Sequence, residues 1–95
     1  MVLGQIVLEE LKLLREKDVS ELINLPPLTE KVMKFGKENV IIYTYRESSN
    51  EGRVVIIVKA FRRRFLFSDA SAEGFAITGH GNISDLNDGE RSTLY

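Results

Sequence analysis

The chain of 95 residues has the length of one domain, and at this size folding buries roughly two-thirds of the surface of the unfolded chain. Its net charge of −1 creates no overall field that would attract nucleic acid or an anionic membrane, so a role of that kind would depend on a local patch. The absence of cysteine excludes disulfides, thiolate catalysis and Cys-based metal sites, and a single histidine argues against a His-based zinc site within one chain. We therefore expect a single domain over residues 1–95 that uses no cofactor.

The N-terminal segment is apolar but lacks a basic region, and two glutamates interrupt it, so we expect a cytoplasmic protein with neither a signal peptide nor a membrane span. Its apolar residues recur at the spacing of one helical face: Leu3, Val7, Leu11 and Leu14. This spacing predicts an amphipathic helix over residues 4–17. Asp18, followed three residues later by Glu21, has the pattern of a capping box and predicts a short second helix that ends before the proline pair at 26–27.

Two structures fit residues 28–36. The spacing of Leu28, Val32 and Phe35 fits a helical stripe, with a glycine stop after it. The alternation of apolar and charged residues over 31–35 fits a strand instead, which would turn at residues 36–39 into the next strand. The preceding prolines and the strand that follows at once favour the hairpin.

The longest apolar run, residues 53–67, is the centre of the predicted sheet. Its β-branched and phenylalanine side chains favour a strand, because such side chains pack well on a pleated surface. The remaining expectations, in chain order, begin with a strand at 40–47, a turn at 48–52, a loop at 68–74 and a strand at 75–78. A turn at 79–82, a strand at 83–86 and a break at 87–89 follow, and the C-terminal tail after this break forms one helical turn. The order predicts an α+β fold: an N-terminal amphipathic helix, plus a short second helix, packed on an antiparallel β-meander of four to five strands.

Both faces of the predicted hairpin of strands 40–47 and 53–61 are apolar, whereas a sheet with one solvated face alternates apolar and polar residues. A symmetric closure across the turn would place the helix on Val55, Ile57 and Phe61. One substantial helix covers only one face, so the other face is the candidate binding surface. We expect that surface to contain Ile41, Tyr43, Tyr45, Ile56, Val58, Arg62 and Arg64.

Three uses of this surface remain open. It would pack on a second copy as a homodimer, or bind a different protein through its tyrosines and arginines. Alternatively, it would bind single-stranded nucleic acid by stacking bases on Tyr43 and Tyr45 while Arg62 and Arg64 hold phosphates. The acidic balance and the absence of a known binding motif disfavour nucleic acid, and a solvated strand end is the simpler explanation of the arginines. A homodimerising or protein-interaction module is therefore the favoured prediction.

Catalysis is not expected. His80 is the candidate general base that titrates near neutrality, but it stands between two glycines in a predicted turn, where an exposed polar residue is ordinary. Asp85, Asp88 and Glu90 are close in sequence, but their spacing does not match a calcium-binding EF-hand loop. The sequence also lacks a glycine-rich phosphate loop, a nucleophile elbow and a metal-binding pair. These observations predict a protein without catalytic or metal sites.

Overall fold

The computed structural model describes residues 3–48, 52–63, 68–79 and 81–92. Its elements are α1 (Leu3–Arg15), α2 (Val19–Ile23), β1 (Leu28–Phe35), β2 (Glu38–Ser48), β3 (Val54–Arg63), β4 (Ser68–Ile77), β5 (Ile83–Asp85) and α3 (Asp88–Arg91). The strands form one antiparallel sheet in the order β1-β2-β3-β4-β5, so each strand pairs with its neighbours in sequence. The predicted α+β fold, with an N-terminal helix packed on an antiparallel meander, is confirmed.

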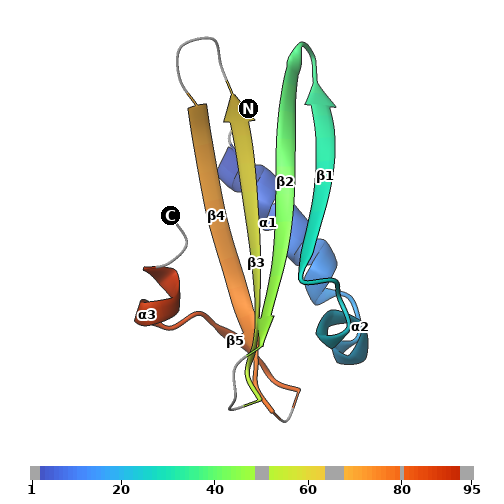
Figure 1. Cartoon of the computed structure of the whole chain (residues 1–95), viewed down its shortest axis with the longest axis vertical. Helices are drawn as coiled ribbons and strands as arrows, with labels where there is room; N and C mark the ends of the chain where they lie inside the picture. The colour runs from blue at the N-terminus through green and yellow to red at the C-terminus, as the bar shows by residue number, and fades with distance from the viewer. Residues whose placement is uncertain (1–2, 49–51, 64–67, 80, 93–95) are drawn as a thin grey trace.

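The core lies between α1 and one face of the sheet, which we call the helix-covered face. α1 runs diagonally across the sheet (Figure 1) and buries the predicted stripe of Leu3, Val7, Leu11 and Leu14, together with Ile6. This stripe packs on the even-numbered residues of β2 and β3 and on two residues of β4: Val40, Ile42, Val54, Ile56, Val58, Ala60, Phe75 and Ile77. Leu22 of α2 is fully buried and completes this cluster.

The register of β2 and β3 differs in parity from the symmetric closure expected from the sequence. Ser48 pairs with Val54, so an odd number of residues, 49–53, separates the last paired positions. Every even-numbered residue of β2 therefore lies opposite an even-numbered residue of β3. Paired residues of antiparallel strands share a face, so the even-numbered residues of both strands lie on the same face of the sheet. The prediction that α1 faces Val55, Ile57 and Phe61 is wrong for this reason.

The hairpin predicted for residues 28–36 is confirmed. β1 turns through Gly36 and Lys37 directly into β2, and Phe35 pairs with Glu38 across the turn. Gly36 has a φ of 62°. Two-residue hairpin turns require such left-handed backbone positions, which glycine adopts without steric cost.

The predicted loop at residues 68–74 is wrong, because these residues form the first part of β4. Their alanines and serines have low strand propensity, and pairing with the long β3 outweighs this local preference. Gly74 has a specific role in the ladder. A Cβ atom at this position would collide with the carbonyl oxygen of Ile56, so the close approach of β4 to β3 requires glycine here.

The two short helices differ in how they start and in their caps. α2 follows Asp18 directly, yet the Asp18 side chain makes no capping hydrogen bond. α3 is a C-terminal helical turn as predicted, but it begins at Asp88, inside the predicted break at 87–89, because Asn87 starts a complete capping box. The Glu90 N–H donates to the Asn87 side chain at 2.8 Å, and the Asn87 N–H donates to the Glu90 carboxylate at 2.9 Å.

The described chain is 44 Å long, 25 Å wide and 19 Å thick. A thickness of 19 Å accommodates the sheet and one helical layer, because packed layers lie about 10 Å apart. α1 and α2 supply that layer on the helix-covered face. Among the described elements, only the short segment around α3 packs on the other side, which we call the open face.

Candidate functional site

The open face consists of the odd-numbered residues of β2 and β3 with their partners in β1 and β4. Its central part is made of cross-strand rows: Val32–Ile41–Phe61–Ala70, Glu30–Tyr43–Lys59–Ala72 and Leu28–Tyr45–Ile57–Gly74. The first and third of these rows contain no charged residue. A solvated sheet face normally carries polar side chains at such positions, so these rows have the composition of a contact surface.

Tyr43 and Tyr45 lie at the middle of the open face. Their ring centroids are 6.2 Å apart and the ring planes are inclined by 32°. Both side chains are half-buried, so each presents part of its ring to the outside. Tyrosine combines an apolar body with a polar tip, which makes it one of the residue types enriched at interfaces.

The α3 segment covers one side of the open face and leaves the other side free. Leu86, just before α3, packs on Ala72 and Ala76, with Val55 and Ile57 at the margin of this cluster. On the opposite side, Leu28 and Val32 of β1 are 52% and 59% exposed. The free surface therefore extends over β1, β2 and the adjoining part of β3.

Arg53 anchors the α3 segment in this position. Its guanidinium donates two hydrogen bonds to the Glu90 carboxylate, at 2.9 and 2.8 Å. These hydrogen bonds hold the pKa of Glu90 below its ordinary value, with a further contribution from the Asn87 N–H, while partial burial opposes the shift. A second ion pair, between Arg91 and Glu73 at 2.9 Å, joins α3 to β4.

The structure divides the residues predicted to form the binding surface. Ile41, Tyr43 and Tyr45 lie on the open face, but Ile56 and Val58 are fully buried beneath α1. Arg62 also lies on the helix-covered face, and Arg64 falls outside the described residues. The prediction that these residues share one face is wrong because of the register. The open-face residues that the prediction omitted are Leu28, Val32, Ile57, Lys59 and Phe61. The β3 residues among them follow from the odd number of residues, 49–53, between the paired ends of β2 and β3.

Arg62 connects three strands at one end of the helix-covered face. It is 6% exposed, and its guanidinium donates to Asp69 of β4 at 2.7 Å and to Glu38 of β2 at 3.3 Å. The hydrogen bond to Asp69 raises the pKa of Arg62, and the Glu38 charge adds to this effect, while burial opposes it. Arg62 therefore joins the sheet together and does not present its charge on the surface that carries the tyrosines.

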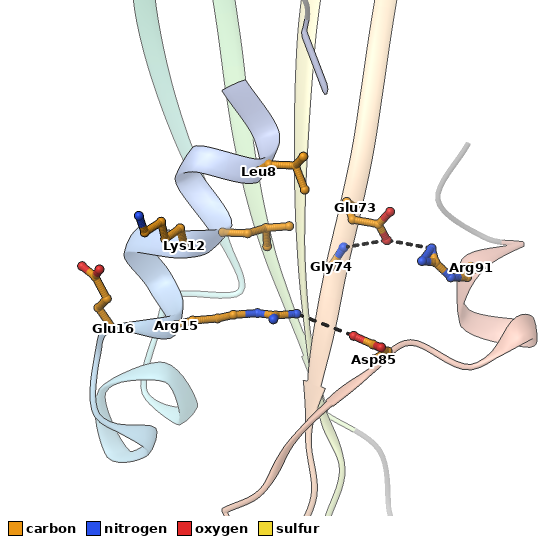
Figure 2. A pocket seen from close by; sticks show the side chains of 9 residues that line it. Leu8, Lys12, Arg15, Glu16, Glu73, Gly74, Asp85 and Arg91 are labelled. Carbon is orange, nitrogen blue, oxygen red and sulfur yellow. Dashed lines mark hydrogen bonds and ion pairs between the residues drawn. The ribbon is translucent and has the colours of Figure 1, made fainter. Parts of the chain in front are cut away.

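A cleft of about 490 Å³ lies between α1, β4 and the α3 segment (Figure 2). Its charged residues are balanced in sign: Lys12, Arg15 and Arg91 against Glu16, Glu73 and Asp85. Arg15 lies 3.8 Å from Asp85 and stacks on the Phe75 ring at 5.2 Å, while Arg91 binds Glu73. The cleft therefore has no excess of positive or negative charge that would select an ionic ligand.

Two further observations concern the part of the chain that the structure describes. It contains no group of three or more His, Asp or Glu side chains placed to hold a metal ion. None of its helices is both long enough and apolar enough to cross a membrane.

Of the residues considered for chemistry from the sequence, Glu90 caps α3 and Asp85 pairs with Arg15, whereas His80 lies outside the described residues. Comparisons with protein-family models, with curated proteins and with solved structures found no match for this chain.

Proposed function

We propose that this chain is a non-catalytic interaction module that forms homodimers by packing its open face against the open face of a second copy. The observation that carries the proposal is the pair of uncharged rows on either side of Tyr43, on the face that α1 does not cover. Burial of these rows removes apolar surface from water, which is the main favourable contribution to most protein association.

The size of the open face supports this proposal. Its free part extends over β1, β2 and β3. Three strands about nine residues long, with a spacing of about 4.8 Å and a rise of about 3.3 Å per residue, present roughly 400 Å² in projection. The accessible area, which includes the relief of the side chains, is larger and approaches the roughly 800 Å² per partner that specific interfaces bury.

A second copy fits this face better than an unrelated surface, because the central row is self-complementary. A two-fold rotation about an axis parallel to the strands and over β2 brings Tyr43 of each copy over Tyr43 of the other, and places the free strands β1 and β3 over one another. Paired aromatic rings are an attractive arrangement at the centre of an interface. The same rotation packs the two sheets face to face as a sandwich.

Single-stranded nucleic acid remains the alternative prediction. It keeps the stacking pair Tyr43 and Tyr45, with Lys59 in the same row. It loses Arg62 as a phosphate ligand, because that side chain lies on the opposite face between Asp69 and Glu38. The homodimer needs no residue from the helix-covered face and is preferred for this reason.

The proposal is tested with the double variant Tyr43→Glu/Tyr45→Glu, which places two charges on the open face. We expect it to have a lower solution mass than the wild type in sedimentation equilibrium, with an unchanged circular dichroism spectrum. Leu8→Glu is the matched control, because Leu8 is a 60% exposed apolar residue of α1, away from the open face. If the glutamates prevent folding, the double variant Tyr43→Thr/Tyr45→Thr, which retains strand propensity, should show the same decrease in solution mass. An unchanged mass in both double variants contradicts the proposal, and binding of an oligonucleotide by a monomeric wild type would favour the alternative.

A further inference from the structure

β1 is an edge strand whose outer side has no partner strand among the described residues. Its backbone orientation follows from one hydrogen bond: the Arg46 N–H donates to the Pro27 carbonyl at 3.0 Å. Hydrogen-bonding positions alternate along an antiparallel pair, so the odd-numbered residues of β1 bond to β2. The even-numbered residues, from Leu28 to Lys34, therefore direct their N–H and C=O groups outward.

This edge is long and accessible. β1 has eight residues, of which only Met33 and Phe35 are half-buried and the rest are exposed. A long exposed edge strand is a template for a further strand, unless charges or distortions oppose the pairing. β1 carries three charged residues, Glu30, Lys31 and Lys34, so their positions decide which strand it accepts.

We propose that β1 pairs antiparallel with β1 of a second copy, about a two-fold axis through Val32, and merges the two sheets into one. In this register Glu30 of each copy lies opposite Lys34 of the other. Val32 lies opposite its own copy, and the outward N–H and C=O groups of all these residues meet their partners. Opposite charges at directly facing positions stabilise an antiparallel pair.

The charge pattern selects this register over its neighbours. A two-fold axis through Glu30, Lys31 or Lys34 would place two identical charges opposite each other, which is unfavourable. An axis through Met33 gives no pair of opposite charges, and axes nearer the start of β1 shorten the ladder. Neither Glu30 nor Lys34 forms a salt bridge with another residue that the structure describes, so both are available to a second copy.

Apolar side chains beside this edge also favour a second copy. On the helix-covered face, a cleft of about 290 Å³ lies between α1 and β1 and is lined by Ile6, Leu13, Met33 and Phe35 among others. Leu13 is 56% exposed at this cleft, and Val32 is 59% exposed on the open face. In the proposed register, Thr29 and Lys31 of the second copy lie opposite Phe35 and Met33, so pairing covers part of this surface.

Edge pairing goes beyond the proposed packing of open faces, because its hydrogen bonds use the outer backbone edge of β1 and do not depend on that packing. The two-fold axis of the edge and that of the open face do not intersect, so the two interfaces together do not close at four copies. The side chain of Glu30 lies on the open face as well as beside the edge. Recovery in a mixture of β1 variants therefore tests the edge, and variants of the tyrosines test the open face.

The test uses charge reversal and recovery, measured as solution mass by sedimentation equilibrium. Lys34→Glu places two acidic residues opposite each other and Glu30→Lys places two basic residues opposite each other, so each variant alone should have a lower mass than the wild type. An equimolar mixture of the two variants restores opposite charges at every facing position and should recover the wild-type mass. The double variant Glu30→Lys/Lys34→Glu should recover it as well. Lys37→Glu, which makes the same charge change in the exposed turn after β1, should leave the mass unchanged.

Circular dichroism confirms that each variant is folded. Single variants that keep the wild-type mass, or a mixture that shows no recovery, would overturn the edge proposal. Failure of the open-face proposal gives a different result. In that case Lys34→Glu is a monomer by itself and Tyr43→Glu/Tyr45→Glu leaves the wild-type mass unchanged.

Discussion

Tyr45 lies directly opposite Ile57 in the register of β2 and β3, and both side chains belong to the face of the sheet that α1 does not cover. The neighbouring Ile56 belongs to the other face and is fully buried. Two adjacent isoleucines of one strand thus have different roles: Ile56 contributes to the core, and Ile57 contributes to the open face beside Leu86.

Leu11 provides a test of the core. It is 4% exposed at the centre of the α1 stripe, so Leu11→Ala should lower the free energy of unfolding by about 2–5 kcal/mol through lost burial and a residual cavity. Denaturant unfolding at one fixed protein concentration measures this, because association changes apparent stability. Leu8→Ala, at a 60% exposed position of the same helix, should change the value by less than about 0.5 kcal/mol. Equal effects of the two substitutions would place the stripe on the wrong side of α1.

Gly74 provides a test of the β3–β4 ladder. Gly74→Ala should destabilise the protein by about 1–3 kcal/mol, because the new methyl group meets the Ile56 carbonyl oxygen and the strands must separate locally. Thermal unfolding measures the effect. Gly79→Ala is the matched control, since a Cβ at Gly79 meets no atom within 4 Å and its backbone is not left-handed. A neutral Gly74→Ala would contradict the register of β4.

The Arg53–Glu90 pair predicts a dependence of stability on pH. Because the pKa of Glu90 is lower in the folded state than its ordinary value of 4.5, its contribution is fully present above pH 4.5 and is lost as the pH falls through the lowered pKa. Glu90→Gln should therefore cost about 1 kcal/mol at neutral pH and progressively less under acidic conditions. Unfolding measured at a series of pH values tests this, with Glu16→Gln, at an exposed position after α1, as the control for loss of a carboxylate. If the difference in unfolding free energy between Glu90→Gln and the wild type does not change with pH, the effect does not come from the charge of Glu90 beside Arg53.

Arg62 and Arg63 differ in what they contact, although they are adjacent. Arg62→Lys should lower the midpoint of thermal unfolding, because one ammonium group cannot reproduce the two-sided contact of the guanidinium with Asp69 and Glu38. Arg63→Lys should have little effect, because Arg63 is exposed. Reversed effects would show that the parity of the register is wrong.

Local patterns allowed α1, the start of α2 and the β1–β2 hairpin to be predicted from the sequence, because helical periodicity, a capping pattern and a glycine turn each depend on nearby residues. The capping box of Asn87 and Glu90, by contrast, was not recognised in the predicted break at 87–89. The register of β2 and β3 could not be predicted in this way. It depends on whether an odd or even number of residues connects the strands, and composition alone does not determine that number.

The first part of β4 was also unpredictable from local propensity, because its small residues resemble a loop until β3 is available as a partner. The predicted binding surface was partly wrong because it was built on the wrong register of β2 and β3. Ile41, Tyr43 and Tyr45 follow from the alternation within β2 alone, whereas Ile56, Val58 and Arg62 were assigned to the surface by the wrong parity.

The central claim is that the open face and the β1 edge are contact surfaces for further copies of the same chain. The most direct measurement is the solution mass of the unmodified protein by sedimentation equilibrium over a wide concentration range. We predict a mass that rises with concentration above that of two chains and falls on dilution toward that of one chain. The mass of a single chain at every concentration would contradict both interfaces.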